Sequence, residues 1–270
     1  MTDAVVIVLR EVLEAMLLIC MLMASSTALG YRFRWMVLAL VLGVCGAIAY
    51  ALRLEQISMA FDGFGQEIVN SALLISIAVL LASHNFFAVR QLNDLSYRMP
   101  YRLMFGLFVG AVGMAMTREG AEIYLYGYSY GVLAGNMSSV FSGGAIGLGI
   151  GLSMGTFFYY VLKSLPRKQR LITCCAVSLV LAAGMMGQVA LYLSQADILP
   201  SQQPLWDTSN VFAESSLIGE LLRGAIGYEA SPTLIQILLY MGSILTSTVA
   251  MIAAWLLYRK SANTVLGDTQ

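Results

Sequence analysis

The sequence has few charges and few of the residues that soluble enzymes use for catalysis. Of its 270 residues, 11% are charged and 59% are hydrophobic, against roughly 25% and 45–50% in a soluble domain. There is a single histidine, and no GxxxxGK[ST] phosphate loop occurs, so the chain does not itself hydrolyse a nucleotide through that motif. The four cysteines lie in apolar stretches without CxxC spacing, which favours small core residues over a disulfide or a thiolate metal centre.

Apolar runs long enough to cross a bilayer, about 17–25 residues, recur along the chain. The N-terminus has no basic segment or small-residue cleavage site, so we expect the first apolar stretch to be a retained helix. The composition excludes a soluble core and predicts an all-α polytopic membrane protein. The seven transmembrane helices expected from hydropathy cover residues 4–29, 34–53, 66–89, 103–129, 140–163, 171–195 and 233–258.

The distribution of lysine and arginine predicts how these helices are oriented. Eleven of the fifteen lie in the connections after the first, third and fifth helices and in the C-terminal tail. Arg53 and Arg223 fall on the opposite side, and Arg10 and Arg118 fall inside the predicted membrane spans. Because cytoplasmic segments carry the excess of positive charge, the N-terminus is predicted outside and the C-terminus in the cytoplasm.

A charged motif occurs twice within apolar sequence, as REVLE at 10–14 and REGAE at 118–122. The predicted topology places the motifs in the first and fourth helices, which run in opposite directions. We therefore predict one membrane domain with an inverted repeat, whose substrate site would lie near the bilayer midplane. Its parts are the three-helix repeats 1–98 and 99–195, the extracytoplasmic connection 196–232 with a short amphipathic helix, and the seventh helix with its cytoplasmic tail, 233–270.

The two motifs carry more negative than positive charge. On a helix, the arginine and both glutamates of each motif lie on neighbouring faces, so each arginine could simply pair with its own glutamates. Four carboxylates against two guanidiniums still leave a formal charge of −2, which either protonation or a bound cation would cancel. Carboxylate oxygens without a nearby histidine or cysteine suit a hard or borderline cation. The predicted metal ligands are Glu11, Glu14, Glu119 and Glu122, supported by Arg10 and Arg118.

Four other polar residues could lie along a cation pathway. Asp62 and Glu67 stand at the outer start of the third helix and could pass a cation inward, although Glu67 also suits a solvated helix start. Tyr126 could touch the pathway or belong to an aromatic belt at the membrane surface. His84, near the cytoplasmic end of the third helix, could be an exit-side ligand or a hydrogen-bonded structural histidine.

Two further patterns concern packing and the outer surface. Glycines recur every fourth residue along 140–163, which lets another helix approach closely. The segment 216–227 can form an amphipathic helix on the outer surface. The connection around it is acidic and could collect cations, dock a donor protein, or be an ordinary loop; its acidic residues include Asp207, Glu214 and Glu220.

Two intramembrane RExxE motifs, in the first and fourth of seven helices, resemble the oxidase-dependent iron permease family of fungi and bacteria. The usual family form is REGLE, so the chain differs at Val12 and Ala121 but at none of the charged positions. The stretches PLWDTSNVF (204–212) and GYEASP (227–232) also resemble bacterial members. The family also has an acidic residue near the position of Glu67.

The resemblance implies a multi-pass permease of the cell membrane that imports iron ions into the cytoplasm. Iron would be its substrate rather than a prosthetic group. The implied partners are the lipid bilayer and an extracytoplasmic oxidase or iron-delivery protein, and no nucleic acid is implied.

Two other functions stay open. A permease for another divalent cation, such as lead or manganese, fits the same carboxylates because oxygen ligands serve several metals. An intramembrane di-iron carboxylate enzyme would need Glu-x-x-His motifs on facing helices, whereas the single histidine, His84, lies far from both motifs in the sequence.

Overall fold

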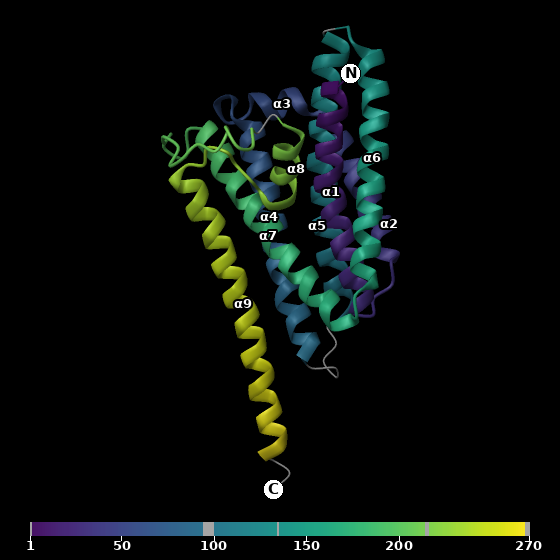
Figure 1. The fold of residues 1–270 in the computed structure, drawn as a ribbon, viewed down its shortest axis with the longest axis vertical. Helices are drawn as coiled ribbons and strands as arrows, with labels where there is room; N and C mark the ends of the chain where they lie inside the picture. Colours follow the sequence, from purple (N-terminus) through teal and green to yellow (C-terminus); the bar gives the residue numbers. More distant parts are fainter. Residues whose placement is uncertain (1, 94–99, 134, 214–215, 268–270) are drawn as a thin grey trace.

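The computed structural model describes residues 2–93, 100–133, 135–213 and 216–267, and these residues form helices and connections without any strand (Figure 1). The seven long helices are α1 Thr2–Ala28, α2 Arg34–Leu52, α4 Gly65–Asn93, α5 Tyr101–Tyr126, α6 Met137–Ser164, α7 Arg167–Gln195 and α9 Leu234–Gly267. The short elements are α3 Leu54–Met59, the 3₁₀ turn η1 Phe61–Gly63, the π-helical turn η2 Gly127–Leu133 and α8 Leu217–Ile226.

Five helices of the described chain, α2, α4, α6, α7 and α9, are long and apolar enough to cross a membrane. Helices α1 and α5 have 27 and 26 residues, and each contains one of the charged motifs. At 1.5 Å rise per residue, each is longer than the hydrocarbon core of a bilayer, which is about 30 Å thick. The all-helical membrane class predicted from composition is confirmed.

Some helix boundaries differ from those expected from hydropathy. The last helix continues to Gly267 rather than ending near residue 258, because hydropathy detects the apolar part of a helix and not its polar continuation. The regular part of α5 ends at Tyr126 rather than 129, where the backbone changes to the π-helical turn η2. A short helix, α8, occupies the segment in which the sequence predicts one.

The long helices pack in pairs: α1 lies along α6, α2 along α5, and α4 along α7. Helix α1 also contacts α5 and α7 at the centre of the bundle, and α8 packs on α1 and α7. Helix α9 lies at one edge, against α4 and α7 (Figure 1). The chain starts at one end of the bundle and finishes at the other, so α1 and α9 run in the same direction.

The α1–α6 pair depends on the glycine stripe of α6. A Cβ on Gly147 would lie 2.6 Å from the carbonyl oxygen of Val5, and one on Gly151 would lie 2.5 Å from Cγ1 of Val12. The two backbones therefore approach more closely than any side chain on those positions would allow. Residue numbers rise together along the interface, so α1 and α6 are parallel.

The α2–α5 pair is built in the same way. A Cβ on Gly120 of α5 would lie 2.7 Å from Cβ of Ala47, and Gly113 faces the carbonyl oxygen of Ala39. Residue numbers again rise together, so these two helices are also parallel. In both pairs, small residues on one helix therefore let the backbone of the other helix approach closely.

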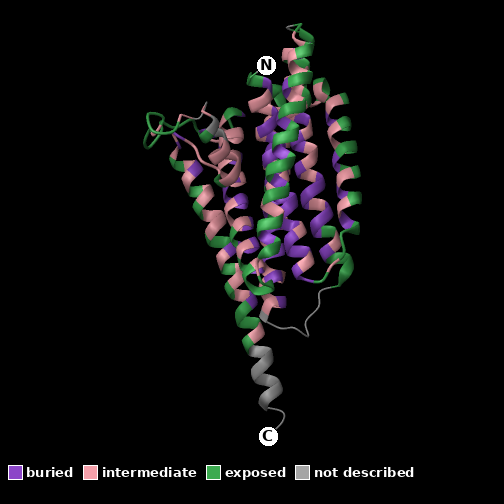
Figure 2. Ribbon diagram, turned by 45° about the vertical axis from the view of Figure 1, so that its right-hand side comes forward, coloured by how far each residue is buried: buried purple, intermediate pink, exposed green. Residues whose placement is uncertain are grey.

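Burial follows the position of each residue in the bundle (Figure 2). Large side chains such as Leu18, Leu74 and Trp35 are almost completely buried at the helix interfaces. The outward faces are also apolar; Phe157 of α6 is 73% exposed and Leu245 of α9 is 65% exposed. Broad apolar faces of this kind mark a surface that contacts something other than water, and on helices of this length the expected contact is lipid.

The glycine stripe yields a prediction with an internal control. Gly147→Ala should lower the stability of the purified protein by about 1–3 kcal/mol, the usual cost of overpacking, although alanine favours helix formation. Gly149→Ala on the same helix, where a Cβ meets nothing within 4 Å, should leave stability unchanged or slightly higher. Thermal unfolding in one detergent measures both, and equal melting temperatures would contradict the close α1–α6 contact.

Candidate functional site

The two charged motifs face each other where α1 and α5 cross. Nη2 of Arg10 lies 3.7 Å from Oε2 of Glu122, and Nη1 of Arg118 lies 3.4 Å from Oε2 of Glu14. Position 10 is opposite 122 and position 14 is opposite 118, so the helices run antiparallel at this point. Each arginine is therefore paired with the last glutamate of the other motif.

Each arginine also contacts the glutamate that follows it in the sequence. Nη1 of Arg118 lies 2.5 Å from Oε1 of Glu119, and Arg10 pairs with Glu11 in the same way. Within the second motif, Nη2 of Arg118 lies 2.9 Å from Oε1 of Glu122. The charges thus form one network across two helices rather than two separate local pairs.

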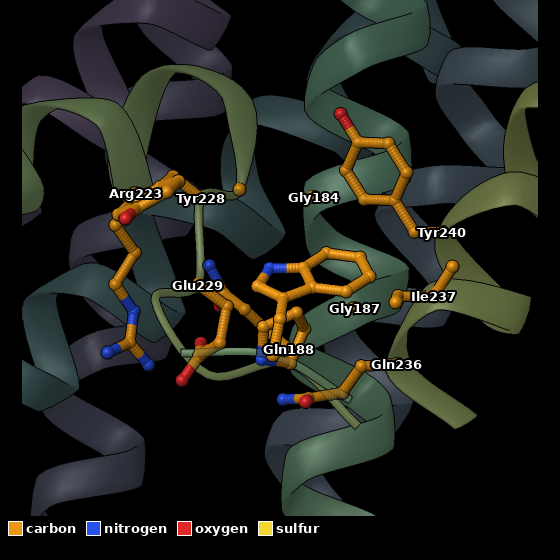
Figure 3. Close-up of a pocket in the computed structure, with 12 residues that line it drawn as sticks. Gly184, Gly187, Gln188, Arg223, Tyr228, Glu229, Gln236, Ile237 and Tyr240 are labelled. Atoms are coloured by element: carbon orange, nitrogen blue, oxygen red, sulfur yellow. The ribbon is translucent and has the colours of Figure 1, made fainter. Parts of the chain in front are cut away.

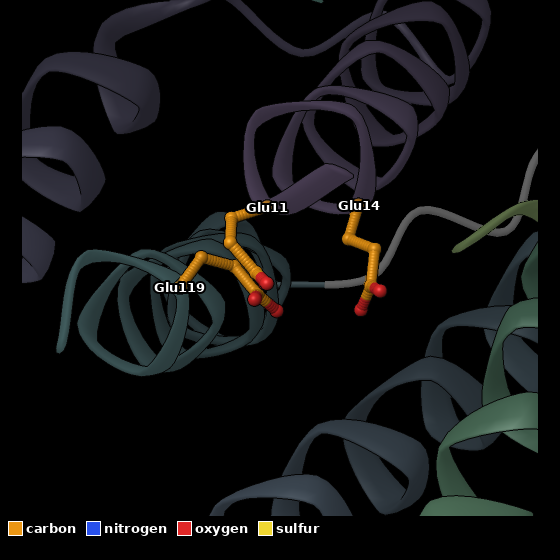
Figure 4. Close-up of side chains that lie close together, drawn as sticks. All are labelled: Glu11, Glu14 and Glu119. Carbon is orange, nitrogen blue, oxygen red and sulfur yellow. The ribbon is translucent and has the colours of Figure 1, made fainter. Parts of the chain in front are cut away.

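Three of the four motif glutamates converge. Glu11, Glu14 and Glu119 each offer a carboxylate oxygen, and these oxygens all lie within 4.8 Å of one another (Figure 4). Glu122 lies outside this group and is held by the two arginines. Three oxygens this close, from two different helices, form a candidate cation site.

The group of three contains buried oxygens without partners. Glu11 is 1% exposed and Glu119 is 4% exposed, and Oε2 of each has no hydrogen-bond partner among the described residues. A buried carboxylate oxygen without a partner is costly. A proton or a bound cation on these two oxygens would remove that cost.

Helix α7 contributes two polar side chains that the sequence analysis missed. Gln188 Oε1 accepts a hydrogen bond from Nη2 of Arg118 at 3.0 Å, and the Tyr192 hydroxyl donates to Oε1 of Glu122 at 3.3 Å. The residues are four apart, hence on one face of α7. A polar pair at this spacing in an otherwise apolar helix is the signal that could have identified them.

Arg223 of α8 was also missed as a site residue. A small cavity of about 30 Å³ is lined by Arg223 together with both motif arginines, Glu14 and Glu122. The next residue, Gly224, lies so close to Glu14 that a Cβ there would be 3.1 Å from the glutamate Cγ. The sequence places Arg223 in an outer connection, and nothing in its pattern shows that this connection folds back onto the first motif.

The predicted outer pathway residues lie near the start of α4. Asp62 is exposed in the turn η1 and has a positive φ of 59°. Glu67 lies in the first turn of α4, and its Oε2 is buried without a partner among the described residues. The Tyr50 hydroxyl of α2 is also buried without a hydrogen-bond partner among the described residues.

His84 is fully enclosed and both of its ring nitrogens are engaged. Nε2 lies 2.7 Å from Oγ of Ser25 on α1, and Nδ1 lies 3.3 Å from Oδ1 of Asn85. Asn85 in turn donates to the carbonyl oxygen of Cys175 on α7 at 3.4 Å. These contacts tie three helices together and favour the structural reading of this histidine over an exit-side ligand.

Two of the remaining candidates, Tyr126 and Asp207, have no ion pair or hydrogen bond with the motif residues among the described contacts. Tyr126 stacks on Tyr130, with ring centroids 5.5 Å apart, and its hydroxyl has no partner among the described residues. Asp207 is exposed, and hydrogen bonds from Ser209 lower the pKa of its carboxyl group. Glu214 and the side chain of Glu220 lie outside the described residues.

A network of buried carboxylates and guanidiniums on long apolar helices is typical of a membrane protein that handles ions. A model of the iron permease FTR1 family matches residues 89–265, which is more than half of the chain. The chain therefore belongs to the iron permease FTR1 family, a family of transport proteins. The matched segment contains the second motif, whereas the first motif precedes it. No curated protein and no solved structure matches the chain.

The unequal burial of the two arginines predicts unequal effects of removing them. Arg118 is 4% exposed and contacts three glutamates, whereas the Arg10 side chain is 24% exposed. Arg118→Gln should therefore cost on the order of 3–5 kcal/mol, as expected when a buried charge loses its partner. Arg10→Gln should cost less. Melting temperature and membrane abundance measure both effects.

Adding Glu119→Gln to Arg118→Gln should restore part of the lost stability, because the second change removes a carboxylate that the first leaves uncompensated. A double variant that is less stable than Arg118→Gln alone would show that the network is not organised by charge balance.

Proposed function

We propose that the protein imports iron ions across the cytoplasmic membrane through a midplane site built from its two RExxE motifs. The observation that carries this proposal is the convergence of Glu11, Glu14 and Glu119, together with the unpartnered oxygens on two of them. Membership of an iron permease family supplies the substrate class. The resident groups of the site are side chains, and iron is the cargo.

The proposed topology has seven spans, with α1 and α5 added to the five apolar helices. Its support is the packing: α1 lies parallel to α6 and α2 lies parallel to α5, while α1 and α5 cross antiparallel at the motifs. This is the arrangement expected of two three-helix repeats related by a twofold axis in the membrane plane. The distribution of lysine and arginine favours an N-terminus outside.

The arginines have two tasks in this proposal. They hold the carboxylates in fixed positions through planar, multi-dentate contacts, and they limit the negative charge that a cation meets. With four carboxylates and two guanidiniums the site keeps a formal charge of −2, which a divalent cation would neutralise. A fully uncompensated cluster would bind the ion too tightly for release.

The membrane potential can provide the driving force. Each unit charge moved inward gains about 2.3 kcal/mol per 100 mV, so a divalent ion gains about 4.6 kcal/mol. An extracytoplasmic oxidase or iron-delivery protein would supply the ion at the outer surface. Glu67, whose buried Oε2 has no hydrogen-bond partner among the described residues, is a candidate for an early step on the way in.

Neutralising the motif glutamates tests the transport site. Glu11→Gln, Glu14→Gln, Glu119→Gln and Glu122→Gln should each lower iron uptake by at least about tenfold, which corresponds to ~1.4 kcal/mol, because each removes charge while keeping shape. Glu55→Gln, at an exposed position on α3, is the matched control and should transport like the parent.

Uptake of radioactive iron should be measured per folded molecule, after correction for membrane abundance. Normal uptake by abundant, folded Glu→Gln variants would place the site elsewhere. Failure of all four variants to accumulate would instead favour a purely structural role for the charges.

Reporter fusions test the topology. A reporter fused after Lys260 should behave as cytoplasmic, and one inserted near Gln202 should behave as extracytoplasmic, because one proposed span, α9, separates the two positions. An enzyme that is active on only one side of the membrane gives the readout at each position. If both reporters were on the same side, the seven-span arrangement would be wrong.

A further inference from the structure

A second cavity adjoins the charged network. It has a volume of about 250 Å³ and lies between α7, α8, α9 and the connections before and after α8 (Figure 3). Two residues, Arg223 of α8 and Gln188 of α7, line both this cavity and the small one that contains Glu14 and Glu122. We call the larger space the outer cavity; the two shared residues form the partition between it and the motif charges.

The outer cavity combines polar groups with a route to the surface. Glu229, Gln188 and Gln236 line its wall (Figure 3). The amide oxygens of the two glutamines accept hydrogen bonds from Arg118 and from the Thr233 amide, so Glu229 is the acidic residue among the lining residues. Trp206, which also lines the cavity, is 51% exposed, so the cavity reaches the exposed part of the molecule. A carboxylate beside water suits the same hard cations as the motif glutamates.

The partition is held in place by contacts at both ends of α8. Ser216 caps its first turn, with the Gly219 amide donating to the serine Oγ at 3.0 Å. At the other end, Gly227 has a φ of 69° and presses on α7, where a Cβ on Gly184 would lie 2.9 Å from the Gly227 Cα. The Tyr240 hydroxyl of α9 donates to the Ile226 carbonyl at 3.0 Å. Arg223 is therefore presented to the cavities by a fixed helix.

Arg223 changes the electrostatics of the approach. It adds a third guanidinium beside the four motif carboxylates, so the formal charge of the motif residues together with Arg223 is −1 rather than −2. A cation coming from the outer cavity passes this guanidinium before it reaches Glu14 and Glu122. At distances of several ångströms, a fixed charge shifts the binding of another ion by a measurable factor even when water screens it partly.

We propose that the outer cavity is the entrance through which the cation reaches the carboxylate cluster, and that Arg223 sets the affinity and the selectivity of this entrance. The inference rests on the proposed function and adds a route and a specificity-determining residue to it. Arg223 is a positive charge fixed to α8, so a weakly bound cation cannot displace it from the entrance. Entry past Glu67, at the start of α4, in place of the outer cavity is an outcome of the tests.

The first test compares the concentration dependence of iron uptake in reconstituted vesicles. Arg223→Gln should lower the KM for ferrous iron about three- to tenfold through the added negative charge, and should let manganese compete more strongly. Arg223→Lys keeps the charge and should stay within about twofold of the parent. Arg53→Gln removes an exposed arginine on the same proposed side and should leave KM unchanged.

The outcomes separate this inference from the proposed function. Loss of uptake in Glu119→Gln, with an unchanged KM in Arg223→Gln, would overturn the role of Arg223 alone. Equal KM shifts in Arg223→Gln and Arg53→Gln would also overturn it, because a general surface charge would then be the cause. If the Glu119→Gln variant took up iron at the rate of the parent protein, the proposed function itself would be wrong. A changed maximal rate at constant KM would indicate a structural effect of Arg223 and count against the proposal.

The second test acts on protein that is already folded. Of the four cysteines, Cys45 is exposed and the other three are buried, so Cys45→Ala provides the background. W206C in this background should transport normally until a positively charged methanethiosulfonate reagent fills the cavity mouth, after which uptake should fall to the level of Glu119→Gln.

The matched control is I198C, at a position 56% exposed in the same connection but outside the cavity, and labelling it should have no effect. Complete labelling of W206C, verified by mass, without loss of uptake would show that the outer cavity is not the entrance. Abolition of uptake by Glu67→Gln in the same assay would then assign entry to the α4 side.

Discussion

The ion pairs between the two motifs are the interaction on which the rest of the structure depends. Six charges inside an apolar bundle carry a gross cost of about 15–20 kcal/mol on an insertion scale, and neither helix can offset its share alone. Arg118 contacts Glu14 and Arg10 contacts Glu122, so the network exists only when α1 and α5 cross at one particular point. The glycine contacts of both helix pairs allow that crossing, because they bring the backbones of α6 and α2 close to α1 and α5.

Much of this arrangement is encoded locally and could be predicted. Apolar runs give the long helices, since a membrane-spanning segment satisfies its own backbone, and the repeated RExxE spacing singles out the motif residues. The sequence predicts all four motif glutamates as metal ligands, and this stays a prediction: Glu11, Glu14 and Glu119 converge, while Glu122 is held by two arginines and Tyr192. Equal spacing in sequence does not produce equal surroundings, because α7 and α8 cover one side of the crossing.

The residues that sequence reasoning missed share one property. Tertiary contacts between segments far apart in the chain bring three residues to the network: Gln188, Tyr192 and Arg223. The residue spacing within their own segments does not predict those contacts. Arg223 shows this most clearly, because its segment is amphipathic and its position next to two arginines is electrostatically unfavourable by itself. Only the docking of α8, fixed by the contact of Gly227 with Gly184, brings it there.

The placement of α8 has a consequence for the symmetry of the site. The two helix pairs use the same kind of glycine contact, and α1 and α5 run antiparallel where the motifs meet, so the paired helices alone surround the two motifs in a similar way. Helix α8 covers only one side of the crossing and contributes an arginine there. The two motifs, alike in sequence, therefore have unlike surroundings: Arg118 is 4% exposed and the Arg10 side chain 24%, and a ten-residue helix outside the paired core contributes to the difference.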